Sequence, residues 1–397
     1  MKKLSICIPT HNGRKSCLKD LLQSILSDIH SSNQEIEICI SDNASTDGTE
    51  DMVANYIAAF PKLIRYNRMA TNIGIRNFFV VIDMAQGEYC WLIGSDDAVL
   101  PYSIGRIIEI LTAIPELPGI TVNKLNFDCQ LTQLIGPDHD QALPEYAEIS
   151  RVLSEKSNIL SNLFTSFFFI SSHIFKKKHW DNIIDNYGVE NLLKFEHFPH
   201  VFVYSQIAIR YEKWFWLADY CVIQRLENFS YFTEVSNKKI DYATQLTADL
   251  ESIASILFSD NKHLYRKIMS KLFFLYWNPI YTIQYVSDLK ISHMDIADAR
   301  QKCVSWFSSI TYFWLTTYLI LFLPPRINRF IVRGFLVIYV YIRKKPSFDR
   351  IREIGRNVYH TLLCILGVES TKDRSLVREK EIAKIYLRMR SKYSDIS

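Results

Sequence analysis

The chain has 397 residues, 48% of them hydrophobic, which suits a globular protein with a sizeable core and two domains. Its eight Cys form no Cys-x-x-Cys pair, so free buried thiols in a reducing compartment are favoured over disulfides or a zinc site. The net charge of +4 combines −8 over residues 1–299 with +12 over residues 300–397, which predicts an anionic partner for the basic C-terminal part.

The first third of the chain alternates predicted strands with predicted helices. The apolar run Leu4 to Ile8 predicts a buried strand; it is too short for a secretory signal, so we expect a cytoplasmic protein. A helix with apolar residues at helical spacing follows, from Leu18 to Leu26. Glu35 to Ile40 alternates as a second strand, and the loop after it, rich in Asx and Ser/Thr, turns and caps a helix over about residues 50–60.

The same alternation continues to residue 93. Leu63 to Tyr66 predicts a third strand, Asn72-Ile73-Gly74 opens another helix that ends at Gly87, and Glu88 to Ile93 predicts a fourth strand. Strands that alternate with helices indicate βαβ units. The fold class predicted from this pattern is α/β with a parallel sheet.

Two adjacent carboxylates, Asp96 and Asp97, follow the fourth strand directly after Gly94; we call them the acidic pair. Ligands of open α/β sheets bind at the carboxyl ends of the strands, where Thr10 and Asp42 should also lie. Two neighbouring carboxylates repel each other unless a cation neutralises them, and their oxygens suit Mg²⁺ or Mn²⁺. A solvated acidic turn or a helix cap is the alternative interpretation.

This edge predicts a nucleotide site. Asp42 could accept a hydrogen bond from a base, Asp96 could hold a ribose hydroxyl, and Asp97 could bind a metal that bridges a diphosphate. No Gly-x-Gly-x-x-Gly segment and no Walker lysine loop follows the first strand, which disfavours dehydrogenases and P-loop NTPases.

Five segments, in order over about residues 3–112, resemble the family 2 glycosyltransferases of the GT-A fold: Ile6 to Asn12, Ser41 to Thr49, Asn72 to Gly74, Gly87 to Tyr89 and Gly94 to Asp97. The resemblance implies inverting transfer of a sugar from a nucleotide-diphosphate donor with a divalent metal. It implies a metal ligand at Asp97 and binding of the nucleotide sugar at Pro9, Thr10, Asn12, Asp42, Asn72, Gly74, Ser95 and Asp96.

The acidic pair departs from the family pattern, because Gly94 stands where the first Asp of an Asp-x-Asp-Asp motif is common. Asp96 and Asp97 therefore carry the expected metal site alone. The Gly-Ser-Asp-Asp form is similar to bacterial O-antigen sugar transferases, including abequosyltransferase-like ones. The Gln-x-x-Arg-Trp motif of processive synthases is absent, which favours addition of a single sugar.

Residues 113–255 are expected to form the acceptor-binding half, with strands at Ile120 to Phe127, Ser166 to Ser172 and Phe215 to Ile223. An inverting transferase needs a general base for the acceptor hydroxyl. Within Phe195 to His200 we expect Glu196 or His197 to be that catalytic residue, with His200 behind them. The alternative is a helix start, since Pro199 fits a first helical turn. Arg225 is expected either to contact the diphosphate or, as the commoner case, to form a surface salt bridge.

Residues 256–397 predict a helical, basic region. The run from Cys303 to Pro325 has no charged residue, and a second apolar run covers 330–342. Both are diluted by polar residues and flanked by Arg and Lys, which favours a helical hairpin lying on the membrane surface over a buried helical core or a single span. Nucleic acid is the poorer partner for this charge, because no RNA- or DNA-binding module occurs.

Together these features predict a GT-A glycosyltransferase domain over residues 1–255, with a nucleotide-sugar half at 1–112 and an acceptor half at 113–255. A membrane-associating region would cover 256–397. The predicted activity is metal-dependent, inverting transfer of one sugar to a lipid-linked bacterial surface glycan such as O-antigen or capsule, at the inner face of the cell membrane. Two alternatives are a non-catalytic glycan-binding protein on a degenerate GT-A fold and a sugar-nucleotidyltransferase; the latter needs a Gly-rich triphosphate loop, which Pro9 to Gly13 does not provide.

Overall fold

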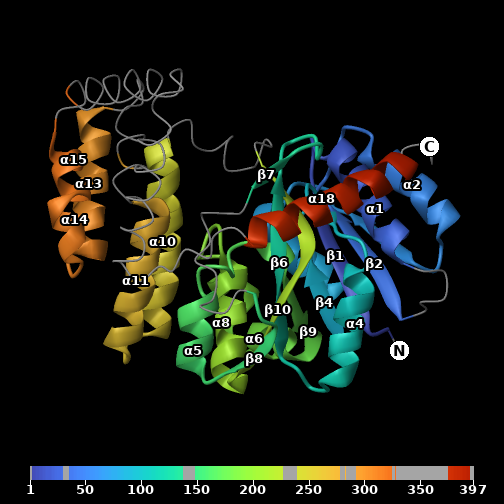
Figure 1. The fold of residues 1–397 in the computed structure, drawn as a ribbon, viewed down its shortest axis with the longest axis horizontal. Helices are drawn as coiled ribbons and strands as arrows, with labels where there is room; N and C mark the ends of the chain where they lie inside the picture. Colours follow the sequence, from blue (N-terminus) through green and yellow to red (C-terminus); the bar gives the residue numbers. More distant parts are fainter. Residues whose placement is uncertain are drawn as a thin grey trace. The chain divides into compact units, whose positions relative to one another are not determined.

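The computed structural model describes residues 2–29, 35–136, 148–226, 239–277, 282, 292–323, 327 and 374–393. Its N-terminal part is built on a mixed sheet with strand order β3-β2-β1-β4-β9-β6-β10-β5, to which β7 adds beside β6 and β8 beside β10 (Figure 1). The strands are β1 (Leu4–Thr10), β2 (Ile36–Asp42), β3 (Ile64–Arg68), β4 (Tyr89–Leu92), β5 (Ala98–Val99), β6 (Gly119–Phe127), β7 (Leu134–Gly136), β8 (Arg151–Ser154), β9 (His173–Lys176) and β10 (Lys213–Arg225).

Strands β3, β2, β1 and β4 are mutually parallel, and β10 is parallel to β6. Strand β9 runs antiparallel to both β4 and β6 and joins the two parallel groups. The predicted α/β class and the strands expected in the first third of the chain are confirmed. Because β1 to β4 share one direction, the loops that follow them converge at one edge of the sheet.

Helices cover the sheet according to the alternation of side chains along the strands. Ile6 of β1 packs in a core cluster with Leu18 and Leu21 of α1, whereas Ser41 of β2 donates a 2.6 Å hydrogen bond to Asn77 of α3. Strands covered in this way read as nearly continuous buried runs, as β1 and β2 do. The helices are α1 (Lys15–Asp28), α2 (Thr49–Ala59), η1 (Gly74–Arg76), α3 (Asn77–Asp83), α4 (Ser103–Ala113), α5 (Lys156–Leu163), η2 (Ile170–Ser172), α6 (Lys177–Tyr187), α7 (Val189–Leu192) and α8 (Pro199–Tyr211).

The strand predicted at Ser166 to Ser172 is wrong. This segment forms turns and then η2, and the strand β9 begins only at His173. Backbone bonds of turn type hold it, with Phe167 N donating to Leu163 O and Phe169 N to Ser166 O. A short apolar run is buried equally well as a turn or as a strand, and its composition cannot distinguish them.

The cysteines agree with the expectation of free thiols. Cys7 and Cys39 are direct neighbours on β1 and β2, and both are buried. Burial raises the pKa of the Cys7 thiol well above its usual value, and the thiols of Cys39 and Cys90 add to the effect. Cys129 is exposed, and Cys364 lies outside the described residues.

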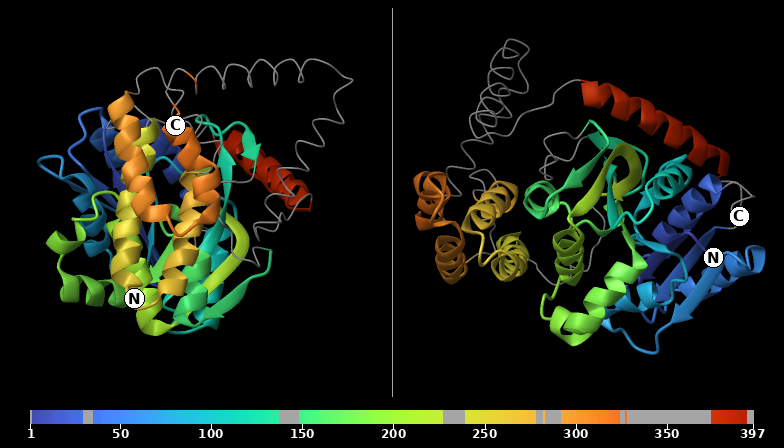
Figure 2. Two further views of the ribbon diagram at one scale, coloured as in Figure 1. Left: turned by 90° about the vertical axis from the view of Figure 1, so that its left-hand side faces the viewer. Right: turned by 90° about the horizontal axis from the view of Figure 1, so that it is seen from below.

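Helix α18 (Arg374–Tyr393) packs with the sheet although most of the chain lies between them in sequence. Its Ala383 and Tyr386 join a core cluster with Leu125 and Phe127 of β6, and the Tyr386 and Phe127 rings meet edge to face at 5.6 Å. Figures 1 and 2 show α18, in red, running across this part of the molecule beside α1. This part of the region predicted to be helical and basic, residues 256–397, is thus a helix.

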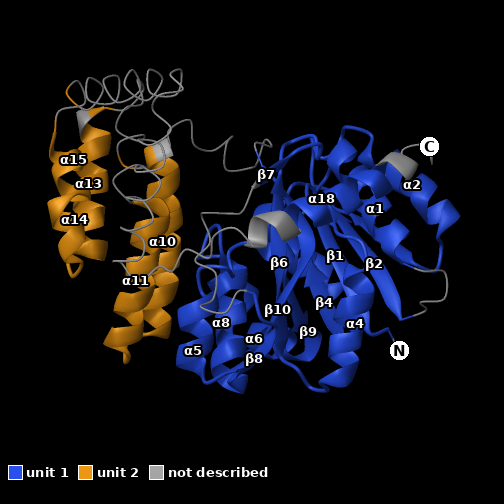
Figure 3. Ribbon diagram, viewed as in Figure 1, with its two compact units in different colours: residues 1–228, 376–397 blue, residues 229–375 orange. Residues whose placement is uncertain are grey.

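The chain divides into two compact units (Figure 3). Unit 1 comprises residues 1–228 and 376–397, and unit 2 comprises residues 229–375. The domain boundary expected at residue 255 lies within α10 (Lys239–Leu257), which belongs to unit 2, whereas α18 belongs to unit 1.

Unit 2 is helical, as expected for the C-terminal region. Beside α10 it contains α11 (Lys262–Tyr276), α13 (His293–Phe307), α14 (Thr311–Leu315) and α15 (Thr317–Phe322). Phe273 lies at its centre, with the rings of Phe307 and Phe313 at 5.3 and 6.2 Å. The indole N–H of Trp277 donates to Thr247 at 2.9 Å, so this buried aromatic residue also has its polar group satisfied.

The uncharged run from residue 303 is not one continuous helix. It contributes the end of α13 and the two short helices α14 and α15. The rest of the predicted hairpin, residues 324–342 except Ile327, lies outside the described residues. None of the helices within the described ranges combines the length and the apolar character needed to cross a bilayer.

Candidate active site

The carboxyl edge of the parallel strands brings the predicted site residues together. β1 ends at Thr10 and β2 ends at Asp42, and these two residues are register partners. The neighbouring strand β4 leads into Gly94 and the acidic pair, with Ile93 N still bonded to Cys7 O at 2.9 Å. Pro9, Thr10 and Ser95 are all buried. The Thr10 hydroxyl has no hydrogen-bond partner among the described residues, so a polar group remains unsatisfied at this edge.

Asp42 is fully buried and already binds two donors. One carboxylate oxygen accepts Ser45 N at 2.9 Å, and the other accepts the Tyr66 hydroxyl at 2.7 Å. Burial and the Asp42 carboxylate raise the pKa of the Tyr66 phenol, which keeps this hydroxyl a donor. Because a carboxylate has about four lone-pair positions, a base N–H would share Asp42 with Tyr66 and Ser45.

Next to Asp42, three polar side chains tie the loops after β1, β2 and β3 together. We call His11, Asn43 and Asn72 the asparagine cluster. Asn43 donates to the Asn72 side chain at 2.7 Å and accepts Ile73 N at 2.7 Å. His11 lies within hydrogen-bond distance of both Asn43 O and the Asn72 amide, at 2.8 and 3.3 Å. The cluster therefore fixes the loop positions with its own hydrogen bonds.

Two further predicted residues belong to the same loops. Asn72 also accepts Gly74 N at 2.8 Å, which begins η1. Asn12 accepts Thr46 N at 2.7 Å. The predicted residues Asn12, Asn72 and Gly74 are thus brought together with Asp42. Asn43 was not among the predicted site residues. Its position directly after Asp42, within the segment Ser41 to Thr49, was the sequence signal that could have identified it.

The acidic pair is more strained electrostatically. Asp97 is 4% exposed and accepts hydrogen bonds from the Ser171 hydroxyl at 2.5 Å and from Arg225 N at 3.3 Å. Burial and then the nearby Asp96 charge raise the pKa of Asp97 to about 7, against the lowering effect of its hydrogen bonds and of Lys124. Asp96 is partly exposed and pairs with Arg14 from the loop after β1.

Gly94 lies close to the carboxylates of both Asp96 and Asp97. A Cβ atom at position 94 would lie 3.1 Å from an oxygen of Asp96 and 3.1 Å from an oxygen of Asp97. Gly94 N also donates to the Ser171 hydroxyl at 2.9 Å, so the backbone is held in this position. A first Asp at position 94, as in the family motif, would place a third carboxylate against the other two.

Two buried cationic side chains lie near the acidic pair. Lys124 was not among the predicted site residues, and Arg225 was predicted in a different environment. Lys124 of β6 bonds to Gln224 and lies 4.2 Å above the Phe169 ring, although a lone Lys in an apolar strand was a visible signal. Arg225 is neither a surface salt bridge nor free for a diphosphate, because its side chain is 3% exposed and every nitrogen is engaged. It donates to Asp96 O at 2.7 Å, Cys129 O at 2.6 Å and Asp20 at 2.9 Å.

The acidic pair fits a divalent cation that takes its other ligands from substrate and water. Asp97 is a buried carboxyl group whose ionised form lacks full compensation, and a cation would supply it. Across the described ranges, no three His, Cys, Asp or Glu side chains gather closely enough to enclose a metal by themselves. Mg²⁺ and Mn²⁺ sites on one or two carboxylates and phosphate oxygens do not need such a cluster.

The predicted base cluster lies beside the turn that also supports Asp97. Pro199 begins α8, as the helix-start alternative predicted. His200 is buried and lies 3.2 Å from Phe168 O, and burial lowers the pKa of His200 to about 4. Glu196 is exposed, and His197 is 8% exposed. Since Phe168 and Ser171 belong to one short segment, it contacts both His200 and Asp97.

Comparisons with known proteins agree with this geometry. Residues 5–126 match the family model described as "Glycosyl transferase family 2". The chain is 33% identical over 217 residues to abequosyltransferase RfbV of Salmonella typhimurium, a match that covers 51% of this chain and 60% of that protein. The matched part therefore spans about three fifths of this relative.

Two solved structures match this chain at low sequence identity. S. aureus TarS 1–349 in complex with UDP-GlcNAc is 13% identical with a TM-score of 0.48, covering 79% of this chain and 91% of that one. Mannosyltransferase PcManGT from Pyrobaculum calidifontis, in complex with GDP-Man and Mn²⁺, is 12% identical with a TM-score of 0.43, covering 83% and 87%. Both TM-scores lie below 0.5.

The resemblance noted in the sequence is confirmed by the family match, which covers all five segments. The same residues build the parallel strands β1 to β4 and the loops at their carboxyl edge. Residues 5–126 of this chain thus match the glycosyltransferase family 2 model, and they contain the parallel strands β1 to β4 of the α/β sheet.

Proposed function

We propose that the chain is a metal-dependent, inverting glycosyltransferase that adds a single sugar from a nucleotide-diphosphate sugar to a lipid-linked bacterial surface glycan. The observation that carries the proposal is Asp97, a buried carboxyl group at the carboxyl edge of a family 2 domain with a pKa raised to about 7. Perturbed carboxyl groups at such positions are candidates for function. The abequosyltransferase named among the relatives makes an abequosyl or related sugar donor the first to test.

In this proposal the donor lies across the edge formed by β1, β2 and β4. Asp42 accepts a hydrogen bond from the base. Asp96 binds a ribose hydroxyl through a carboxylate oxygen that Arg14 would have to release. Asp97 would hold Mg²⁺ or Mn²⁺, whose positive charge would stabilise the leaving diphosphate. Asn12, Asn72 and Gly74 keep the surrounding loops in place through the bonds described above.

Glu196 or His197 would act as the general base that takes the proton of the acceptor hydroxyl. Glu196 is accessible to an acceptor because its side chain is exposed. Buried His200, with its pKa lowered to about 4, would stay neutral and support the segment around Phe168. Comparison of Glu196→Gln with His197→Gln, at saturating donor, assigns the base: its replacement should lower turnover by about a hundredfold or more and the other by far less.

The central experiment measures thermal stability with UDP, GDP, CDP and dTDP sugars, each with and without Mn²⁺. A ligand that binds the native state raises the melting midpoint by mass action. We expect a metal-dependent shift for one nucleotide in the wild type and none in Asp97→Asn, which keeps the shape of the side chain but replaces its charge and one acceptor oxygen with an amide NH2 group. Asp83→Asn, on the exposed end of α3, is the matched control. A shift that survives in Asp97→Asn would contradict the assigned metal site.

The departure at Gly94 favours one rival, a glycan-binding protein that has lost catalysis. The two proposals differ in donor chemistry. A catalyst should release free sugar from its donor slowly in the presence of Mn²⁺ and no acceptor, whereas a binding protein should shift in stability with glycans and leave every donor intact.

We further propose that unit 2 binds the inner face of the membrane and so brings the enzyme to a lipid-linked acceptor. Leu315 and Phe322 of α14 and α15 are 67% and 65% exposed, and Trp314 and Leu319 are exposed beside them. The Arg300 guanidinium lies 5.4 Å over the Phe322 ring, which places a cation at the border of this apolar surface. Apolar faces bordered by basic residues bind interfaces of anionic lipids.

Sedimentation with vesicles of phosphatidylglycerol and phosphatidylcholine tests this part. The double variant Leu315→Glu, Phe322→Glu should no longer bind anionic vesicles. A higher salt concentration should weaken the binding of the wild-type protein to these vesicles. Ile256→Glu, at an apolar residue of α10 that is 56% exposed, is the control and should leave binding unchanged. Equal binding of both variants would contradict the assignment of this surface.

A further inference from the structure

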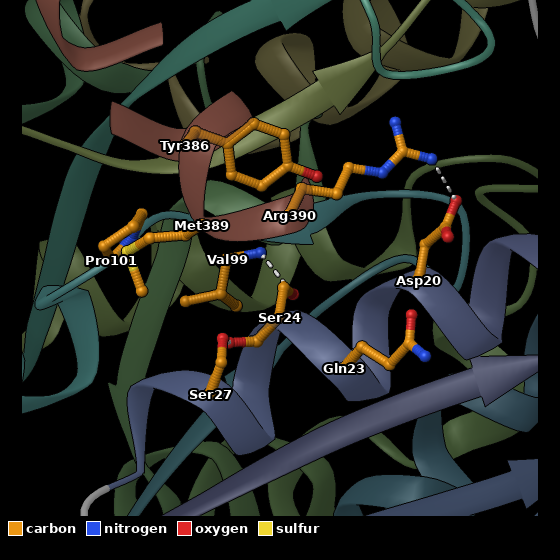
Figure 4. Close-up of a pocket in the computed structure, with 9 residues that line it drawn as sticks. All are labelled: Asp20, Gln23, Ser24, Ser27, Val99, Pro101, Tyr386, Met389 and Arg390. Atoms are coloured by element: carbon orange, nitrogen blue, oxygen red, sulfur yellow. Dashed lines mark hydrogen bonds and ion pairs between the residues drawn. The ribbon is translucent and has the colours of Figure 1, made fainter. Parts of the chain in front are cut away.

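Helix α18 contacts the same small region of unit 1 that supports the acidic pair. Its Arg390 donates to the carbonyls of Gln130 and Leu131 at 2.6 and 2.7 Å. The other terminal nitrogen of Arg390 lies 3.4 Å from the Asp20 carboxylate of α1 (Figure 4). Arg390 therefore joins α18 to two separate anchor points, a carboxylate and a turn.

Arg225 of β10 uses the same two anchor points. It bonds to the same oxygen of Asp20 at 2.9 Å and to the carbonyl of Cys129, the residue before Gln130, at 2.6 Å. Its remaining side-chain bond and its backbone N–H go to Asp96 O and to the Asp97 carboxylate. The two arginines thus share Asp20 and the turn at residues 129–131, and one of them ends at the acidic pair.

Further contacts hold α18 in the position that this arrangement requires. Tyr220 lies on β10, five residues before Arg225, and its hydroxyl donates to Glu379 of α18 at 2.6 Å. Tyr386 packs against Phe127 at the end of β6, directly before the turn. Each of these contacts fixes α18 against a strand that leads into the turn or into Arg225.

We propose that α18 is a positioning element for the active site: through Arg390 it fixes Asp20 and the 129–131 turn, which fix Arg225, which in turn holds the backbone and the carboxylate of the acidic pair. Charge-assisted bonds to a shared carboxylate are strong and directional, so loss of one arginine loosens the anchor of the other. The inference rests on the proposed function only in giving the acidic pair a role toward donor and metal.

The first test needs no activity and no metal. Asp97 N donates to Gly94 O at 3.1 Å, so its amide exchanges when this turn opens. In Arg390→Ala we expect hydrogen exchange over residues 94–97 to speed up about threefold or more, with exchange in β1 unchanged. Lys384→Ala is the control, since Lys384 is an exposed base on the same helix paired with Glu381. Unchanged exchange at 94–97 in Arg390→Ala, with faster exchange in α18 itself, would overturn the proposal.

The second test separates positioning from folding. Arg390→Ala should raise the Mn²⁺ concentration for half-maximal donor binding about threefold to tenfold, and Arg390→Lys, which keeps the charge, should recover part of it. Both are measured by thermal shift on the full chain. A normal Mn²⁺ dependence in Arg390→Ala would contradict the proposal. If the wild type binds no donor while exchange at 94–97 still responds to Arg390→Ala, the proposed function fails and the positioning role stands.

Discussion

Two parts of the same sheet edge differ in how their polar groups are satisfied. In the asparagine cluster and around Asp42, each side-chain amide or carboxylate meets neutral partners within the chain. At the acidic pair, a buried carboxyl group stands beside a second carboxylate, and its pKa rises to about 7. The first region is preformed and stable by itself, whereas the second retains an electrostatic cost that a bound cation would remove.

The largest expected effect tests this difference at Asp97. Asp97→Asn should lower turnover about a thousandfold if the proposed function holds, because the carboxylate assigned to the metal is lost. The same change should stabilise the metal-free protein at pH 8, by about 2–4 kcal/mol, because the folded state no longer carries a buried charge. Denaturant unfolding in chelator and a donor-turnover assay measure the two effects.

The sign of this stability change depends on pH. With a folded pKa of about 7 and an unfolded value near 4, the wild-type carboxyl group keeps its proton longer in the folded state. Its contribution therefore falls as pH rises from about 4 to 7 and is constant above that range. Asp97→Asn should lack this loss, and a variant less stable than wild type at pH 8 would contradict the strain assigned to Asp97.

A third carboxylate should increase the strain. Gly94→Asp is expected to destabilise the metal-free protein by about 2 kcal/mol or more, because its side chain would meet both carboxylates of the acidic pair. Gly94→Asn, of equal size and without charge, should cost less. Mn²⁺ should restore a larger part of the stability of the Asp variant than of the Asn variant; equal responses would show that the effect is steric.

Buried His200 should give a pH dependence of opposite sign. Its folded pKa of about 4 lies below its usual value of about 6.5, so the unfolded chain takes up a proton first as pH falls. Stability is lost between about pH 6.5 and 4. His200→Gln keeps a donor toward Phe168 O and should remove about 2 kcal/mol of this loss at pH 4. Unfolding curves at pH 7 and pH 4 measure it, and an unchanged loss would contradict the effect.

The smallest effect is expected in the satisfied region. Tyr66→Phe removes one donor from Asp42 but leaves Ser45 N in place, so the free energy of unfolding should fall by about 1 kcal/mol. Tyr187→Phe, at an exposed tyrosine, is the control and should be neutral. A loss at Tyr66 as large as the gain at Asp97 would remove the distinction between the two regions.

Local chemistry explains what the sequence could predict. β1, β2 and β4 are uninterrupted apolar runs ended by turn residues, so their type and the loops after them followed from the residues themselves. The 166–172 segment could not be assigned in the same way, since its apolar residues follow neither the two-residue period of a strand nor the 3.6-residue period of a helix.

The missing parts of the site depend on contacts between distant residues. Ser171 is 74 positions from Asp97, and Arg225 is 205 positions from Asp20. The pairing of Arg390 with Asp20 spans 370 positions. No spacing rule connects such residues, because only the packing of distant strands and helices brings them together. Lys124 was visible as a charge in an apolar strand, but its proximity to Asp97 was not.

The cysteines described in the fold give the molecule its own reporter groups. Cys129 is exposed, and its carbonyl is one of the two anchors of Arg225, whereas Cys7 and Cys39 lie in the middle of the sheet. A thiol reagent should label Cys129 at once and the sheet thiols only at the rate of global opening. One alkylation time course, measured by mass spectrometry, would thus report the opening of the sheet through Cys7 and Cys39. The rapid labelling of Cys129, whose carbonyl binds Arg225 beside the acidic pair, would serve as its internal standard.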